Sequence, residues 1–289
     1  MISLLVALLI AHPGYARDIE KASLALEADP DNVAVLVVRA DYSRRAGAFG
    51  DARMDLARAH CLDPNLPEVW LSLALTEYDM GDLPAAESWA TAYLETGGAS
   101  VKAHWTRARI RSARGDVNGA LADFDAALAP AAHIDIYLER AAMLRQADRL
   151  DEALAGLQHG VAASGSDVLR AELAELLLEM GRNDDVIGLC DAAVARTRVS
   201  TQWLLLRARA HEAAGRPEAA LADRENAFAR AQEFSKLRPG ALAARNLARV
   251  FLALGRYSDA KRVLATLVDA DADDADTLNL QRRAAAGER

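Results

Sequence analysis

Glycines, small residues and large apolar residues return at a fixed interval along almost the whole chain. Glycines stand at positions 47, 81 and 115 and again at 181, 215 and 255, and Asp148 stands where a further glycine would complete the series. Five residues after each of these positions comes another small residue, in the order Ala52, Ala86, Ala120, Ala153, Val186, Ala220 and Ala260. An interval near 34 residues is typical of a repeat architecture.

The residue types explain why the interval predicts paired helices. Glycine ends a helix by taking a left-handed conformation that other residues resist. The small residue that follows lies early in the next helix, where a larger side chain would push two crossing helices apart. Large apolar residues such as Leu56, Phe124, Leu157 and Leu264 fill the space between. Each repeat is therefore predicted to be a helix, a tight turn and a second antiparallel helix, and the lack of long β-branched runs argues against a sheet.

Two repeats show the fullest signature. Its residues are Trp70, Leu73, Ala74, Gly81, Ala86 and Leu94 in the second repeat and Leu247, Ala248, Phe251, Gly255, Tyr257 and Ala260 in the last. This pattern resembles the tetratricopeptide repeat (TPR) family, and the resemblance covers residues 17–270. It implies an all-α fold, a right-handed superhelical solenoid of about seven antiparallel helix pairs in which the first helix of every pair lines a concave groove.

The sequence departs from this pattern in three places. The fourth repeat carries Asp148 instead of glycine, the fifth carries Val186 instead of alanine, and 40 residues separate the glycines of the last two repeats. The long interval predicts a longer helix or loop around residues 231–240, with Pro239 and Gly240 as the site of a local kink.

The ends of the chain are predicted to differ from the repeats. Residues 1–16 hold the uncharged run MISLLVALLIA followed by Pro13 and Gly14, which fits a secretory signal peptide cleaved after Ala16. The alternative is that residues 2–12 form a buried first helix. Residues 17–32 are predicted to be an N-terminal capping helix or half repeat, residues 33–272 the solenoid, and residues 273–289 a C-terminal capping helix and tail. A cleaved signal would place the protein in the periplasm or outside the cell.

The resemblance also implies which residues face a partner. Inner positions counted from residues 33, 67, 101, 134, 167, 201 and 241 give the candidate binding residues Arg44, Arg45, Tyr78, Trp105, Arg109, Arg145, Glu172, Glu175, Arg209, Arg245, Asn246 and Arg249, with Asp79 and Glu139 beside them. Arginine binds carboxylates through two hydrogen bonds and aromatic rings supply flat apolar area, so such a groove suits an extended peptide or a partner's helix.

Other recurring residues are predicted to be structural. Arg39, Arg107, Arg140 and Arg207 share the seventh position of their repeats, where their stems would pack at helix crossings while their heads reach solvent or a carboxylate. Trp70 and Trp203 are expected in the core, as are both cysteines, Cys61 and Cys190.

Composition and motifs limit which partners, metal sites and reactions the sequence supports. The formal net charge of -8 disfavours nucleic acid as a partner. The run DADADDAD at 269–276 begins like a calcium loop but has Asp274 at the required glycine and Leu280 in place of the final glutamate. No nucleophile elbow, phosphate loop or dinucleotide fingerprint is present. The sequence therefore predicts no enzyme, no cofactor and no metal site.

The leading hypothesis is a non-enzymatic scaffold that holds a protein or peptide in the concave groove. One alternative is an accessory subunit that self-assembles, as a homo-oligomer or within an envelope complex. Another is an envelope protein that handles a small molecule or metal through its inner arginine and glutamate clusters. The fold alone does not choose among these, because one fold serves many functions.

Overall fold

The computed structural model describes residues 13–97, 100–196, 201–267 and 274–287. Within these ranges the chain is all-α and contains no strand. Its helices are α2 Pro13–Ala28, α3 Val33–Arg45, α4 Phe49–Leu62, α5 Pro67–Met80, α6 Leu83–Glu95, α7 Val101–Ala113, α8 Val117–Leu128, α9 Ile134–Gln146, α10 Leu150–Ser164, α11 Asp167–Glu179, α12 Asn183–Arg196, α13 Thr201–Ala213, α14 Pro217–Leu237, α15 Ala241–Ala253, α16 Tyr257–Leu264 and α17 Ala275–Ala286.

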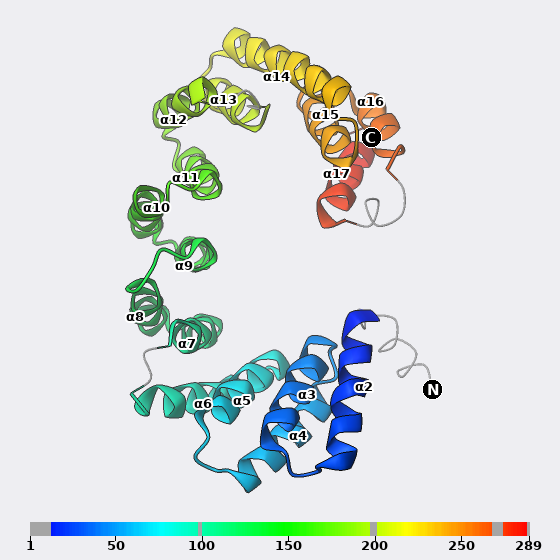
Figure 1. Cartoon of the computed structure of the whole chain (residues 1–289). Helices are drawn as coiled ribbons and strands as arrows, with labels where there is room; N and C mark the ends of the chain where they lie inside the picture. The colour runs from blue at the N-terminus through cyan, green and yellow to red at the C-terminus, as the bar shows by residue number, and fades with distance from the viewer. Residues whose placement is uncertain (1–12, 98–99, 197–200, 268–273, 288–289) are drawn as a thin grey trace. The chain divides into compact units, whose positions relative to one another are not determined.

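The chain divides into two compact units, and the first is Met1–Arg149. In it α2 packs on α3, and the antiparallel pairs α3–α4, α5–α6 and α7–α8 follow in chain order, with α9 packed on α8 (Figure 1). The first helices of neighbouring pairs also touch, α3 against α5 and α5 against α7. This contact places the side chains of successive first helices next to one another on one face of the unit.

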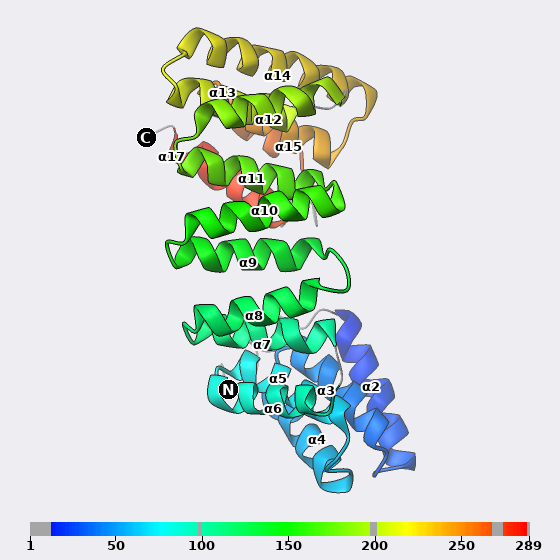
Figure 2. The same ribbon diagram turned by 90° about the vertical axis from the view of Figure 1, so that its left-hand side faces the viewer.

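The second unit, Leu150–Arg289, repeats the arrangement with its own ending. Helix α10 packs on α11, the pairs α11–α12, α13–α14 and α15–α16 follow, and α17 packs against both α15 and α16. Figure 2 shows α13 and α14 lying side by side. The first helices α11, α13 and α15 touch in sequence, as their counterparts do in the first unit.

The turn residues take the predicted left-handed conformation. Gly81, for example, has φ 85° and ends α5 with its N–H bonded to the carbonyl of Tyr78. Asp148 adopts the same conformation with φ 57°, and it is the one non-glycine residue with positive φ in the described part of the chain. The fourth repeat therefore keeps the turn without the glycine, at the cost of a strained aspartate.

The small residues lie where the helices cross, as predicted. Ala52, Ala86, Ala120, Ala153, Val186, Ala220 and Ala260 are all 0% exposed. The large side chains between them, Leu56, Phe124, Leu157 and Leu264, are at most 1% exposed. The residues that recur along the sequence are therefore the residues that pack between helices.

The N-terminal helix differs from its expected bounds. Helix α2 begins at Pro13 rather than after Ala16. Proline is well tolerated in the first turn of a helix, because the N–H it lacks has no partner there. Residues 1–12 of the predicted signal peptide lie outside the described residues, and the predicted cleavage point after Ala16 lies inside α2.

The long interval before Gly255 is a longer second helix. Helix α14 has 21 residues and ends at Leu237, and Gly240, with φ 149°, precedes α15. After α16, helix α17 packs Leu280 and Ala284 into a cluster with Phe251 and Leu264. This contact covers the last apolar face of the second unit, as a capping helix must.

Two core predictions are wrong. Cys61 is exposed in the last turn of α4, whereas Cys190 is buried as expected. Trp70 is only partly buried, and its Nε1 donates a 3.0 Å hydrogen bond to the Pro64 carbonyl oxygen. Trp203 is in the core with 5% exposure.

Candidate functional site

The recurring arginines form ion pairs that hold three helices together. Arg39 donates Nε and Nη2 to Asp55 at 2.7 and 2.6 Å, and Arg207 contacts Asp223 in the same way at 2.8 and 2.6 Å. Each guanidinium also bonds the preceding helix through Nη1, Arg39 to Ser23 and Arg207 to Asp191. These residues are therefore structural, as predicted, and are not available to a partner.

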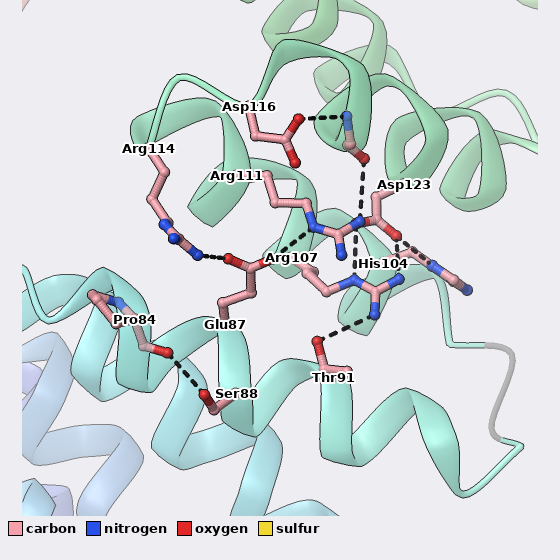
Figure 3. A network of polar contacts seen from close by, with 11 residues as sticks. Pro84, Glu87, Ser88, Thr91, His104, Arg107, Arg111, Arg114, Asp116 and Asp123 are labelled. Atoms are coloured by element: carbon pink, nitrogen blue, oxygen red, sulfur yellow. Dashed lines mark hydrogen bonds and ion pairs between the residues drawn. The ribbon is translucent and has the colours of Figure 1, made fainter.

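Asp123 is the centre of a larger network of the same kind, which also includes Arg111 and His104 (Figure 3). It accepts two hydrogen bonds from Arg107, at 2.9 and 2.7 Å, and one each from Arg111 at 2.8 Å and His104 Nδ1 at 3.1 Å. Arg111 also reaches Glu87 on α6. Burial alone would raise the pKa of the Asp123 carboxyl, but the hydrogen bonds from Arg107 and His104 and the arginine charges outweigh it and lower that pKa.

The predicted inner residues of the first unit pair from one first helix to the next. Arg44 on α3 donates to Asp79 on α5 at 2.6 Å and to Asp41 at 3.0 Å. Burial would lower the pKa of Arg44, but its two carboxylate partners outweigh that effect and raise it. Arg45 is exposed and pairs with Asp41 at 2.9 Å.

A second group on the same face joins α5, α7 and α9. The Arg109 guanidinium lies over the Tyr78 ring, 4.9 Å from its centroid, and its Nε is 3.6 Å from Glu139 Oε2. Trp105 Nε1 donates to the same oxygen at 2.7 Å. All four side chains stay partly exposed, so the group presents two aromatic rings and an ion pair to solvent.

A shallow pocket of about 390 Å³ lies on the first unit beside Arg45. Its wall includes Val38, Tyr42 and Tyr93, and its charges balance, with Arg45 and Lys102 against Asp41 and Glu68. The Tyr15 ring, from α2, lies 6.4 Å from the Tyr42 ring. This pocket therefore combines apolar and aromatic side chains with charges that balance.

The second unit has a larger pocket, of about 700 Å³, built mainly on α13 and α15. Four predicted residues line it: Glu175, Arg209, Asn246 and Arg249. Two arginines that the sequence analysis did not predict, Arg224 on α14 and Arg283 on α17, complete the wall. They were missed because only first-helix positions were counted, and no signal in a single repeat points to them.

The remaining predicted residues have other surroundings. Arg245 bonds Asp274 at 3.1 Å and Thr277 at 3.4 Å, which attaches α15 to α17. Arg145 on α9 and Glu172 on α11 are partly buried. Arg245 is therefore a structural contact of the capping helix rather than part of the pocket.

The described residues contain no group of histidine, cysteine, aspartate or glutamate side chains able to hold a metal ion. Asp269, Asp271 and Asp273 of the calcium-like run lie outside them. In the same ranges, no helix combines the length and apolar character needed to cross a membrane.

Comparison with known proteins finds family models that match part of the chain. Residues 172–236 and 211–284 each match a family described as Tetratricopeptide repeat. The structure of yeast Tom70 resembles this one with a TM-score of 0.59 and 17% identity, covering 95% of this chain and 58% of that one. The chain has the tetratricopeptide repeat fold.

Two further solved structures are similar. PilF from Pseudomonas aeruginosa has a TM-score of 0.51 at 14% identity, covering 73% of this chain and 94% of its own. A structure of the Cut9–Hcn1 tetramer of the APC/C has a TM-score of 0.45 at 15% identity, and the match covers 93% of this chain and 52% of that one. The chain thus spans little more than half the length of Tom70 and of the Cut9–Hcn1 chain. No curated protein matches it by sequence.

Proposed function

We propose that this TPR-fold chain is a non-enzymatic scaffold that binds a partner protein or an extended peptide along the face formed by its first helices. One observation carries the proposal. In the first unit Tyr78, Trp105, Arg109 and Glu139, from three successive first helices, form one partly exposed group. Such a group is built across repeats rather than within one, which is what a ligand lying across the helices would contact.

The chemistry of this group suits a protein ligand. Tyrosine and tryptophan provide large contact area at low conformational cost, and tryptophan, tyrosine and arginine dominate the binding energy of protein interfaces. Glu139 fixes both Trp105 and Arg109 by direct contacts, so these side chains lose little freedom when a partner binds. The group is therefore preorganised.

A double substitution tests the proposal. Trp105→Ala with Arg109→Ala should abolish capture of a specific partner from an extract of the source cells, because it removes the ring and the guanidinium at the centre of the group. The matched control is Arg58→Ala on the second helix α4, whose side chain is exposed and pairs with Asp31. Circular dichroism should show both variants folded. Equal capture by the double variant and the natural protein would contradict the proposal.

We further propose that residues 1–16 act as a secretory signal and that the mature protein lies in the periplasm or outside the cell. The apolar run and the small residues before Arg17 support this. Cleavage after Ala16 would remove the Tyr15 ring from its contact with Tyr42, which lines the pocket of the first unit. N-terminal sequencing of exported protein tests the proposal, and an intact Met1 would refute it.

A further inference from the structure

The first and last described helices are each half of a repeat. Helix α2 packs on α3 as a second helix would, and no first helix is described before it. Helix α17 packs on α15 and α16 as a first helix would, and no second helix is described after it. In complete pairs such as α5–α6 and α13–α14 the two helices pack closely on each other. Each of the two terminal helices therefore lacks its usual neighbour in the described part of the chain.

Hydrogen bonds fix the position of α2 within the repeat. Arg39 donates Nη1 to Ser23 just as Arg107 donates Nη1 to Thr91, and each acceptor lies sixteen residues before its arginine. Ser23 is therefore equivalent to Thr91, and Asp18 is equivalent to the residue that lies five positions before Thr91. In α4, α6, α8, α10, α12, α14 and α16 this position holds an alanine or a valine that is 0% exposed. Only α2, among these second helices, carries a charged residue there.

The repeat interval fixes the position of α17. Its buried residues Thr277 and Ala284 lie 34 residues after Ala243 and Val250, which are buried on α15. Arg282 is then the eighth residue of a first helix. The other first helices, from α3 to α15, all have an alanine there that is at most 2% exposed: Ala40, Ala74, Ala108, Ala141, Ala174, Ala208 and Ala248. Arg282 is exposed instead, and it forms no ion pair with a residue that the structure describes.

The two positions face each other within a complete pair. The contacts in the apolar cores are those of Ala40 with Ala52, Ala74 with Ala86, and Ala248 with Ala260. A pair made from α17 of one copy and α2 of another therefore places Arg282 opposite Asp18. Opposite charges replace two alanines, and their larger side chains fit within the range of helix separations, about 8–10 Å. Lys21, whose Nζ lies 3.4 Å from Asp18, is exposed, so little is lost when an arginine takes its place.

An apolar contact accompanies the ion pair. Leu278 on α17 is 42% exposed, whereas Leu204, at the same position of α13, is 0% exposed and packs with Ala227 of α14. Ala25 on α2 has the position of Ala227 and is exposed. The composite pair would cover Leu278 with Ala25, as α13 and α14 cover the equivalent residues. The two free faces therefore match in both charge and apolar surface.

We propose that the two ends of the chain bind each other between copies, so that α17 of one copy and α2 of the next form a composite helix pair held by Arg282 and Asp18. The partner is a second copy of the chain, joined head to tail. Because the two surfaces differ, successive contacts produce open oligomers or rings. The residues of the α2 surface follow Ala16, so the cleavage proposed above leaves them in place. The aromatic group of the first unit takes no part, so this inference stands or falls separately from the scaffold function.

Sedimentation velocity of the full chain over a wide range of concentrations tests the inference. The natural protein should sediment faster as its concentration rises. Arg282→Glu and Asp18→Arg should each abolish this shift by weakening association at least about tenfold, because like charges then face each other. An equimolar mixture of the two variants should regain the shift, since the altered end of each variant is complementary to the altered end of the other.

Arg283→Glu is the matched control. It makes the same change one residue further along α17, where the side chain lines pockets on the second unit, and it should leave the shift unchanged. Circular dichroism should show every variant folded, because none of the altered side chains is buried. A natural protein that stays monomeric, or a mixture that does not associate, would overturn the inference. A shift that Arg282→Glu abolishes and Asp18→Arg does not would indicate a symmetric contact between two α17 helices and would overturn it as well.

Discussion

Buried arginine–aspartate pairs are the most consequential single contacts of the chain. Asp123 is 2% exposed and accepts four hydrogen bonds from positively charged or histidine side chains. Replacing a buried ion pair by apolar residues can be neutral, but removing one partner leaves an unpaired charge in the interior. Removing one partner of the pair is therefore expected to lower the free energy of unfolding by more than the intact pair contributes to it.

Asp123→Asn should lower the free energy of unfolding by about 3 kcal/mol, since it leaves the partly buried Arg107 without its carboxylate partner. Asp125→Asn on the same helix is the control. Asp125 is 64% exposed and contacts Arg140 at 3.2 Å, so its loss should change stability by about 0.5 kcal/mol or less. Urea unfolding followed by circular dichroism measures both, and equal effects would contradict the structural role of Asp123.

The same pair predicts an acid dependence. Because the folded pKa of Asp123 lies below its ordinary value of about 4, its contribution is fully present above that value and is lost as the pH falls through the folded pKa. Unfolding free energies measured between neutral and acid pH should fall more steeply for the natural protein than for Asp123→Asn. Parallel curves would show that the carboxyl does not titrate differently on folding.

The two cysteines should react at very different rates. Burial raises the pKa of the Cys190 thiol to about 12, whereas Cys61 is exposed. Only the thiolate is nucleophilic, so at mildly alkaline pH a disulfide reagent should modify one thiol rapidly and the other only after denaturation. Cys61→Ser should remove the fast phase. Two fast thiols, or a fast phase that survives this substitution, would contradict the burial of Cys190.

At the scale of the helix pair, the turn controls how each hairpin closes. Six repeats use a glycine with positive φ and one uses Asp148. The turn can be recognised in the sequence because it depends on one residue alone. That residue must take a backbone conformation that glycine adopts without strain. The elements themselves are short, so their stability comes from packing on neighbouring helices rather than from the isolated hairpin.

Substitutions at two equivalent turns should have opposite signs. Gly81→Ala should destabilise by about 1 kcal/mol, because alanine resists φ 85°, and no atom within 4 Å would hinder the added methyl group. Asp148→Gly should stabilise by about 0.5 kcal/mol, because relief of the backbone strain exceeds the added entropy of the unfolded chain. Thermal unfolding measures both changes. Two shifts of the same sign would refute the shared role of the turns.

Prediction from the sequence succeeded where the cause was local and failed where it depended on a contact with another helix or on how a helix ends. The burial of Ala86 and Ala220 follows from the repeat interval alone. The partner of Arg39 lies sixteen residues away on another helix, so the repeat pattern predicted the structural role of this arginine but did not identify Asp55 as its partner. Arg283 comes from the capping helix, and the exposure of Cys61 depends on how α4 ends, neither of which a repeat pattern encodes.

At the scale of the whole molecule, the two units share one architecture and differ in chemistry. The first presents an aromatic and charge-balanced inner face, and the second presents an arginine-rich pocket. The chain as a whole carries a formal net charge of -8. A long polyanion should therefore be repelled by the chain as a whole.

Duplex DNA should accordingly not bind at physiological salt. A mobility-shift assay with a short duplex measures this directly, and the expected result is no shifted band. A stable DNA complex would mean that local arginine clusters outweigh the negative net charge of the chain. Nucleic acid would then become a candidate partner.

The arginine–aspartate pairs also limit how such a gene can evolve by recombination. Each of Arg39, Arg107 and Arg207 bonds a residue on the helix before it and an aspartate on the helix after it. Deleting or duplicating a 34-residue module would join such an arginine to a helix that lacks the complementary oxygen. Repeats that look interchangeable in sequence are therefore tied to their position, and shuffled versions should be rare among viable descendants.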